Sequence, residues 1–265
     1  TLARFFYSAP FVVALALGYL WATGAAWPGH TPLFWAYAVA GGLSQILATW
    51  CVVALFSERN FAVGITFKKT EVVQTALVGF VILGEGLSLA GIAAIALGLV
   101  GVLLLSDPPG GTGAWHRRIV NRAAGLGLLS GVFFACSAVG YRGASLALSS
   151  GDVFLRAAFT LVIVTGSQTL AMALWLAWKE RGQIALVAQN WRIAGLVGLT
   201  SMAGSLCWFS AFTLQTAAYV NALGQVELIF SFIASYFFFK ERSSLRELLG
   251  VAVLMASILL LILLI

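Results

Sequence analysis

The stretch FAVGITFKKTEVVQTALVGFVIL, residues 61–83, decides the fold, because it is as long as a membrane-spanning helix and carries three ionisable residues near its middle. A helix needs about 20 mostly apolar residues to cross a bilayer. Within this stretch, only Lys68, Lys69 and Glu71 carry charge. Charged side chains inside a bilayer are costly and usually serve a function. The stretch therefore predicts a transmembrane helix with a functional polar face.

The composition extends this interpretation to the whole chain. Of 265 residues, 61% are hydrophobic and 9% are charged, and the mean hydropathy is +1.00. A soluble domain carries about 25% charged residues, and a disordered chain is poor in hydrophobic residues, so neither class fits. The apolar runs are continuous rather than alternating, which argues against a transmembrane β-barrel. The sequence predicts an all-α integral membrane protein.

Nine apolar stretches are long enough to cross a membrane: residues 4–22, 31–56, 61–83, 87–105, 123–148, 153–178, 193–212, 217–239 and 245–265. The gaps between them hold turn-forming and charged residues. The longest gap, 106–122, contains two prolines followed by two glycines, and we interpret it as a linker between two halves.

An internal repeat relates these halves. A shift of 156 residues, without gaps, superposes Trp35 on Trp191, Cys51 on Cys207, Glu71 on Glu227 and Glu85 on Glu241. Because tryptophan and glutamate are scarce in this chain, the matches indicate a common origin. We divide the chain into a first repeat at 1–105, the linker at 106–122 and a second repeat at 123–265.

The repeat also predicts how the helices cross the membrane. Arg4 begins the first apolar stretch as Arg156 begins its counterpart, so the stretch 123–148 has no partner in the first repeat. We therefore expect repeats of five helices, with the first helix absent from this chain. Five crossings are an odd number, so the second repeat enters from the opposite side, as in many secondary transporters. The expected fold is a ten-helix inverted-repeat bundle (5+5) with nine helices visible.

The positive charges gather in alternate gaps: Arg59, Arg117, Arg118, Arg122, Lys179, Arg181, Lys240, Arg242 and Arg246. By the positive-inside rule these gaps face the cytoplasm. We expect a cytoplasmic linker around Arg117, an external C-terminus and a location in the cell (inner or plasma) membrane. The net charge of +6 follows from this topology, so nucleic-acid binding is not implied.

The pattern resembles the EamA-type members of the drug/metabolite transporter superfamily. Four features carry the resemblance: an arginine opening the second helix of each repeat (Arg4, Arg156), a glutamate in each fourth helix (Glu71, Glu227), a glutamate before each fifth helix (Glu85, Glu241) and small residues in each fifth helix (Gly98, Gly101, Gly250, Ala256, Ser257). The resemblance implies transport of small metabolites, often outward. The missing first helix and the two lysines of FKKTE depart from the family pattern.

Helical spacing predicts which polar residues line the transport path. Gly64, Lys68, Glu71, Thr75 and Gly79 share one stripe of a continuous helix, and Gly224, Glu227, Ser231 and Ser235 share the matching stripe of the second repeat. Weaker candidates for the same path are Gln45, Trp50, Tyr141, Trp208 and Asn221, each of which could instead serve packing.

Several interpretations of the charged residues stay open. Glu71 or Glu227 could exchange a proton, and Lys68 could attract a carboxylate or phosphate of the substrate. Alternatively, Lys68 and Glu71 could form a fixed packing pair at i, i+3, or the helix could be misplaced. Lys69 points about 100° away from Lys68 on a continuous helix, so it could reach the membrane interface or the neighbourhood of Gln74 instead.

The sequence predicts a transporter rather than an enzyme. His30 and His116 lie far apart in different gaps, and we find no catalytic grouping, metal-binding spacing or nucleotide-binding loop, so no cofactor is expected. The predicted function is secondary active transport, as an exporter of small polar metabolites such as amino acids or related organic anions. Expected partners are the substrate, possible coupling protons and membrane lipid, with the protein a monomer or weak homodimer. A uniporter or channel, a structural membrane protein and an enzyme acting on lipid-linked substrates remain alternatives.

Overall fold

The computed structural model describes residues 2–58, 61–105, 122–149, 151–180, 182–238 and 245–264. All regular elements in these ranges are α-helices, and one isolated β-bridge joins His30 to Leu148. The prediction of an all-α membrane protein is confirmed. Some residues used in the topology argument lie outside the described ranges: Arg59, Arg117, Arg118, Arg181, Lys240, Glu241 and Arg242.

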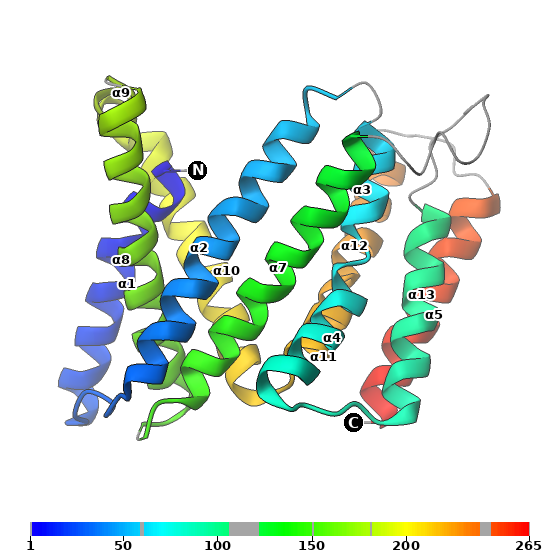
Figure 1. Ribbon diagram of the computed structural model, residues 1–265, viewed down its shortest axis with the longest axis horizontal. Coiled ribbons are helices and arrows are strands. Elements are labelled where there is room, and N and C mark those ends of the chain that lie inside the picture. The colour runs from blue at the N-terminus through cyan, green and yellow to red at the C-terminus, as the bar shows by residue number, and fades with distance from the viewer. Residues whose placement is uncertain are drawn as a thin grey trace. The chain divides into compact units, whose positions relative to one another are not determined.

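Five described helices are long and apolar enough to cross a membrane: α1 (Leu2–Thr23), α2 (Pro32–Leu55), α7 (Arg122–Leu146), α8 (Val153–Lys179) and α10 (Trp191–Leu214) (Figure 1). The shorter α5 (Leu89–Leu105) and α13 (Leu245–Leu264) are apolar as well. These helices follow the predicted stretches within a few residues. A further short helix, α9 (Gln183–Gln189), was not predicted.

The two stretches expected to be continuous helices are each divided in two, so that prediction was wrong. Residues 61–83 form α3 (Phe61–Lys68) and α4 (Glu71–Leu83), and residues 217–239 form α11 (Ala217–Gly224) and α12 (Val226–Phe238) (Figure 1). We call the two interruptions, at residues 69–70 and at residue 225, the helix breaks. Because 69 and 225 are equivalent in the repeat, both helices are interrupted at the same place.

The backbone explains the helix breaks. At the first, the Thr70 N–H donates to the Phe67 carbonyl at 3.1 Å, and at the second the Gln225 N–H donates to the Ala222 carbonyl at 3.2 Å. These bonds span three residues instead of four, which is the tighter 3₁₀ pattern that often marks a hinge within a helix. The Thr70 hydroxyl also donates to the Phe67 carbonyl at 2.7 Å, competing with the regular ladder.

The chain forms two compact units. Unit 1 comprises Thr1–Ile46 and Ser137–Gln215, and unit 2 comprises Leu47–Cys136 and Thr216–Ile265. The boundaries fall inside α2 and α7, so each of these helices contributes to both units. Each unit also takes helices from both sequence repeats, and we describe the two units separately.

In unit 1, α1 packs against α8 and α10. Gly198 on α10 allows the closest approach, because a Cβ there would meet the Tyr7 main-chain carbon at 2.6 Å. On α7, a Cβ at Gly143 would meet the Tyr37 ring at 2.9 Å. Small residues let helices approach closely in a bilayer, where packing replaces the hydrophobic drive.

In unit 2, the main contact joins α5 to α13. A Cβ at Gly98 would meet the Ser257 hydroxyl at 2.6 Å, and one at Gly101 would meet the Leu254 nitrogen at 2.8 Å. The Ser257 hydroxyl donates to the Ala94 carbonyl at 2.7 Å. The small residues of both predicted fifth helices therefore form a close helix–helix contact.

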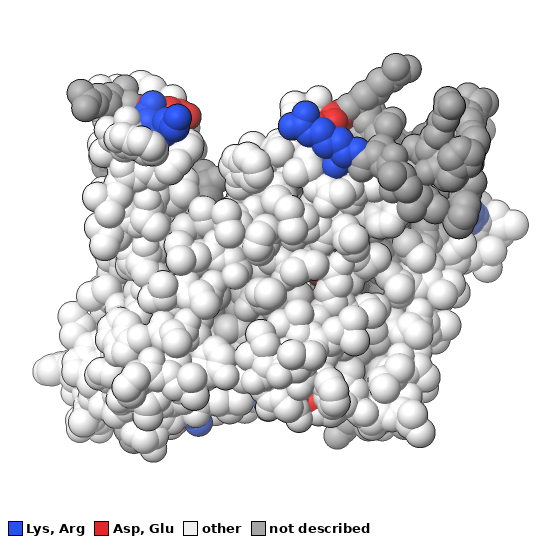
Figure 2. Space-filling view, viewed as in Figure 1, with Lys and Arg blue, Asp and Glu red and all other residues white. Residues whose placement is uncertain are grey.

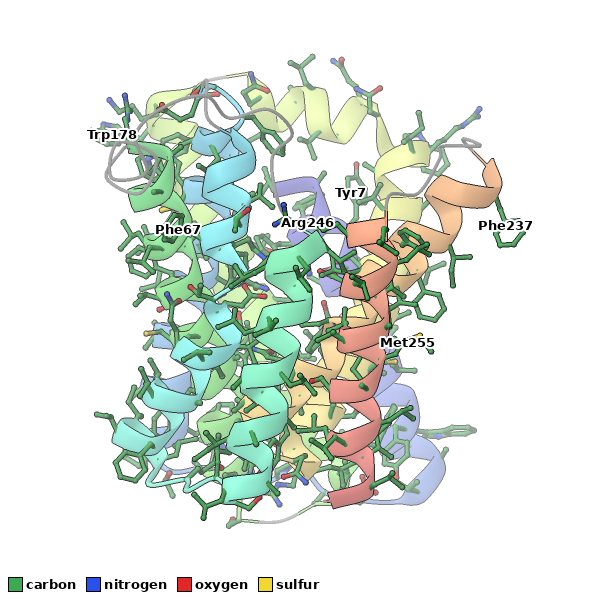
Figure 3. The ribbon with its side chains drawn as sticks, turned by 90° about the vertical axis from the view of Figure 1, so that its right-hand side faces the viewer. Tyr7, Phe67, Trp178, Phe237, Arg246 and Met255 are labelled. Atoms are coloured by element: carbon green, nitrogen blue, oxygen red, sulfur yellow. The ribbon has the colours of Figure 1, made fainter. Side chains whose placement is uncertain are left out.

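Apolar side chains cover the outer surface, as expected for contact with lipid. Trp178 and Phe237 are exposed and project away from their helices (Figure 3). On the face seen in Figure 2, uncharged side chains cover most of the surface, and the few Lys and Arg side chains in view lie toward its edges, among them those near the end of α8 and near the start of α7. An apolar body with charged ends is what a bilayer selects.

Candidate functional site

Two adjacent lysines at the first helix break reach two carboxylates. Lys68 Nζ lies 3.1 Å from Glu71 Oε2, and Lys69 Nζ donates to Glu227 Oε1 at 2.8 Å. All four residues belong to unit 2, and we call them the lysine–glutamate cluster. Lys69 is the most enclosed, with 9% of its side chain exposed, whereas 63% of the Glu227 side chain is exposed. The cluster carries no net charge.

The helix breaks stabilise these charges. Glu71 and Glu227 lie in the first turns of α4 and α12, and Lys68 lies in the last turn of α3. A helix has a partial positive charge at its N-terminus and a partial negative charge at its C-terminus, so all three side chains have the favourable sign. Continuous helices would offer no such ends at these positions.

Further contacts enclose the first helix break. The Lys68 ammonium lies 4.8 Å from the centre of the Phe134 ring on α7, a cation–π distance. Gln74 Nε2 donates to the Thr70 hydroxyl at 3.1 Å. Gly131 lets α7 approach this point, because a Cβ there would meet the Lys68 carbonyl at 3.3 Å.

The second helix break is tied to α4 by neutral groups. Asn221 Nδ2 donates to the Thr75 hydroxyl at 2.9 Å, and this hydroxyl donates to the Glu71 carbonyl at 2.7 Å. Gln225 is buried and its Nε2 donates to the Asn221 carbonyl at 3.4 Å, a long contact. Its Oε1 is buried and accepts no hydrogen bond from the described residues. Gln225 therefore holds an acceptor that a ligand could use.

Most predicted residues of the two stripes gather in unit 2. The contacts just described involve Lys68, Glu71, Thr75 and Glu227, together with the weaker candidate Asn221. Gly224 ends α11, and the side chain of Ser231 lies outside the described residues. Lys69 and Gln225 were not among the residues that helical spacing predicted for the transport path. The repeat itself relates these two residues, so comparing the two breaks position by position could have identified them.

The other predicted residues lie elsewhere. Trp50 and Trp208 are exposed, and Trp208 packs beside Phe212 with ring centres 5.6 Å apart. Gln45 and Tyr141 take part in a hydrogen-bond network of unit 1. The Tyr141 hydroxyl donates to Gln45 Oε1 at 2.9 Å.

Gln168, which the sequence argument missed, completes this network from α8. Its Nε2 donates to Gln45 Oε1 at 2.7 Å, to the Gly42 carbonyl at 3.1 Å and to the Tyr141 hydroxyl at 3.2 Å. Tyr141 and Gln168 are buried, and the Tyr141 ring stacks on Phe209 with centres 4.5 Å apart. The network is neutral and fixed in place by packing.

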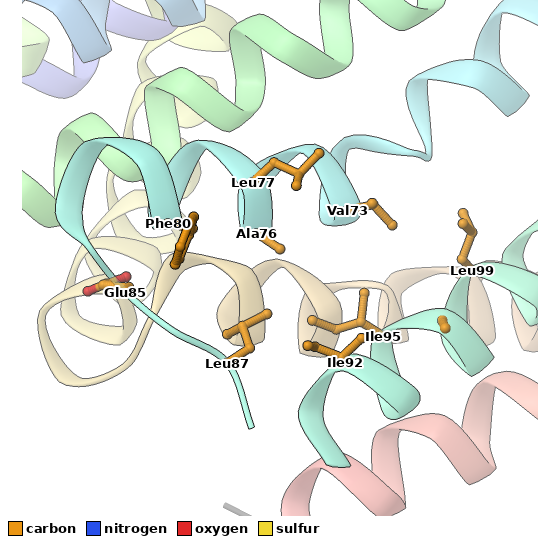
Figure 4. A pocket seen from close by; sticks show the side chains of 10 residues that line it. Val73, Ala76, Leu77, Phe80, Glu85, Leu87, Ile92, Ile95 and Leu99 are labelled. Atoms are coloured by element: carbon orange, nitrogen blue, oxygen red, sulfur yellow. The ribbon is translucent and has the colours of Figure 1, made fainter. Parts of the chain in front are cut away.

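A cavity of about 490 Å³ lies between α4 and α5 in unit 2 (Figure 4). Val73, Leu77 and Phe80 line one side and Ile92 lines the other, and Glu85 is the single ionisable residue of the lining. A small polar solute would find one carboxylate and otherwise apolar walls. The lysine–glutamate cluster is therefore the stronger candidate site.

The chemistry of the cluster suits reversible binding of charged groups. In the described ranges, no three His, Cys, Asp or Glu side chains gather closely enough to hold a metal ion. Two ammonium groups, two carboxylates and one buried amide oxygen that accepts no hydrogen bond from the described residues can recognise both signs of charge on a small solute.

Comparison with known proteins gives one family and one fold. The model of the EamA-like transporter family matches residues 121–263. A solved structure whose title reads only "Crystal structure of protein" aligns with a TM-score of 0.69 at 14% identity, covering 100% of this chain and 88% of that chain. At this identity the likeness concerns the fold alone. No curated protein matches the chain.

Proposed function

The chain belongs to the EamA-like transporter family of the drug/metabolite transporter superfamily, and we propose that it is a secondary active transporter that exports small polar metabolites by alternating access. The proposed substrates are amino acids or related organic anions, and the proposed location is the cell (inner or plasma) membrane. Its apolar membrane-length helices make it a multi-pass membrane protein.

One observation supports this proposal above all: two repeat-equivalent helix breaks each carry a carboxylate, and each carboxylate is paired with a lysine of the first break. Secondary transporters commonly use interrupted helices, whose ends bind the charged groups of substrates and coupling ions. The repeat assignment, 1–105 and 123–265, supports two inverted halves built around such sites.

The chemistry of the cluster favours a zwitterionic or anionic substrate. Either lysine ammonium can leave its glutamate for a substrate carboxylate, and the released glutamate can then accept a substrate ammonium group. Gln225 Oε1 adds an acceptor for a further N–H or O–H donor. The binding step exchanges ion pairs instead of leaving charges unpaired, which would be costly in a bilayer.

The same exchange offers a route to proton coupling. A carboxylate that loses its cationic partner in a low-dielectric site binds a proton more readily. Glu71 and Glu227 are the proposed proton carriers, because each has a lysine partner that a substrate could draw away.

Transport by reconstituted protein tests the proposal. Proteoliposomes would be given a radiolabelled mixture of the common amino acids, with uptake measured against concentration and in counterflow. We expect saturable uptake that is accelerated by unlabelled amino acids inside the vesicles. Uptake that neither saturates nor shows counterflow would indicate a channel, and no uptake of amino acids or organic acids would contradict the substrate class.

The direction of transport and the topology need separate tests. An exporter should raise the tolerance of cells to a toxic amino-acid analogue when overexpressed, whereas an importer should lower it. A cysteine introduced at Gly113 should be protected from an impermeant reagent added outside the cell, while a cysteine in a C-terminal tag should react. Labelling of both positions from outside would contradict a cytoplasmic linker.

A further inference from the structure

Arg4 is a cation in the first turn of α1 (Leu2–Thr23), a candidate membrane span of unit 1. Its guanidinium Nε donates to the hydroxyl of Ser201 at 2.7 Å. Ser201 lies roughly midway along α10 (Trp191–Leu214), so the contact is made well inside that helix rather than at its end. The Arg4 side chain is exposed and forms no other hydrogen bond with the described residues, although its guanidinium also lies 5.8 Å from the Phe5 ring centre.

Among the described residues of this unit, two other arginines carry hydrogen bonds, and both donate to backbone oxygens. Arg142 Nη1 donates to the carbonyls of Phe212 and Gln215 at 2.8 and 2.7 Å. Arg156 donates twice to the carbonyl of Ser145, at 2.9 and 2.6 Å. Arg4 differs from both, because its two Nη groups have no such acceptor in the described part of the chain.

No carboxylate neutralises Arg4 within the described ranges. The unit's Asp152 caps α8 by accepting from the Leu155 N–H, and it also accepts from the Tyr19 hydroxyl. None of the ion pairs in the described residues includes Arg4. A cation inside the bilayer pairs with a counter-ion or faces a water-filled cavity, and one near a helix end can also reach the polar interface.

Ser201, which accepts from Arg4, and the neutral network of Gln45, Tyr141 and Gln168 all belong to unit 1. A guanidinium whose Nη groups are unoccupied is a planar fork that matches an oxyanion, and it can bind one through two parallel hydrogen bonds.

We propose that Arg4 is an oxyanion-binding residue of unit 1 that takes the carboxylate or phosphate group of a transported solute. It uses none of the residues of the lysine–glutamate cluster. The inference rests on the proposed function in one respect, namely that the bound anion belongs to a transported solute; anion binding itself is tested without transport.

Site-specific chemical modification tests the binding directly. Purified full-length protein would be treated with phenylglyoxal, which reacts with accessible arginines, and the rate at Arg4 would be followed by peptide mass spectrometry. Inorganic phosphate and acetate are the two probes, compared with chloride at equal ionic strength. At about ten times the dissociation constant, a bound anion should slow the reaction at Arg4 about tenfold.

Arg192 is the matched control, because it lies at the start of α10 with its guanidinium 5.5 Å from the Trp191 ring centre. Its reaction rate should not change. Protection of Arg4 by both probes, or by phosphate or acetate alone, supports the inference and identifies the preferred oxyanion. Equal rates at Arg4 in phosphate, acetate and chloride would overturn it and leave Arg4 as a structural contact to Ser201.

A second measurement separates binding from folding. Whichever probe protects Arg4 should raise the midpoint of thermal unfolding of the wild type and of R192Q but not of R4Q. A rise that persists in R4Q would overturn the assignment. Protection without transport would leave the anion site in place and contradict the proposed function, whereas amino-acid transport without protection would contradict only the anion site.

Discussion

Unit 2 pairs two lysines with two glutamates at two helix breaks, whereas unit 1 keeps its helices continuous and buries neutral amides and a phenol. In unit 2, Lys69 donates to Glu227 across two helices at the points where both helices are interrupted. In unit 1, Gln45, Tyr141 and Gln168 bond to one another from three continuous helices. The free ends of a helix stabilise charge inside a bilayer, whereas neutral groups can satisfy one another without such ends.

This difference indicates which unit changes during transport. A tightened turn within a helix is a common hinge, and ion pairs can exchange partners with a charged solute. A buried network of neutral hydrogen bonds in close packing is rigid by comparison. We therefore expect substitutions at the lysine–glutamate cluster of unit 2 to alter coupling, and substitutions in the neutral network of unit 1 to alter stability.

The largest expected effect is the loss of proton coupling in unit 2. Either Glu71→Gln or Glu227→Gln should reduce pH-gradient-driven uptake of the amino-acid mixture to the level of empty vesicles, because the amide cannot carry a proton. Glu85→Gln is the matched control and should keep the dependence on the gradient, since Glu85 lines the apolar cavity instead. Normal gradient dependence in both cluster variants would remove these glutamates as proton carriers.

The next largest expected effect is a loss of stability in unit 2. Glu227→Gln should lower the free energy of unfolding by about 2–3 kcal/mol, because the enclosed Lys69 ammonium loses its partner; a fully buried pair would cost about 3–5 kcal/mol. Adding Lys69→Met should recover most of this loss, as measured by thermal unfolding in detergent. A double variant as unstable as the single one would show that the pair does not act as a unit.

A substitution in the neutral network of unit 1 should lower stability without changing proton coupling. Tyr141→Phe removes a hydroxyl that donates to Gln45 and accepts from Gln168, so it should cost about 1–3 kcal/mol of stability. Proton coupling per transported solute should not change, as measured by uptake at several pH gradients. If Tyr141→Phe changed the number of protons coupled to each transported solute but left stability unchanged, the expectation that this network serves stability alone would be wrong.

The smallest expected effect concerns the loop before α8. Hydrogen bonds from the Tyr19 hydroxyl and from the Leu155 N–H hold the pKa of Asp152 below its usual range. Asp152→Ala should cost about 0.5–1 kcal/mol, at the low end for an N-cap because the site is exposed. The stabilisation is present above the ordinary carboxyl value of about 3.9 and is lost as the pH falls through the lower folded-state value.

Unfolding midpoints of wild type and variant should therefore converge in acid. A difference that stays constant down to the lowest accessible pH would show that the carboxylate charge does not contribute to this cap.

Sequence reasoning predicted much of this arrangement, and its errors have physical causes. Counting apolar residues located the helices, and i, i+3 spacing brought Lys68 to Glu71. On a continuous helix, Lys69 would point away from the stripe of Lys68 and Glu71, so it was not predicted at the site. Helical periodicity relates neighbours on one helix only. The partner of Lys69 is on α12, which no local pattern records. Gln168 was missed for the same reason, since its partners lie on α2 and α7.

The central claim, that the lysine–glutamate cluster binds the transported solute, is tested most directly by removing its Lys68–Glu71 pair. Lys68→Met alone leaves Glu71 without its cation, so it is compared with the charge-free variant Lys68→Met plus Glu71→Gln, both checked for thermal stability. The measurement is counterflow of labelled amino acids, with amino-acid analogues lacking the carboxylate as neutral controls.

We predict that the charge-free variant folds as stably as the wild type and still exchanges the analogues that lack the carboxylate, but no longer exchanges amino acids. A charge-free variant that folds well and exchanges amino acids at the wild-type rate would contradict the account and leave the Lys68–Glu71 pair as a packing contact.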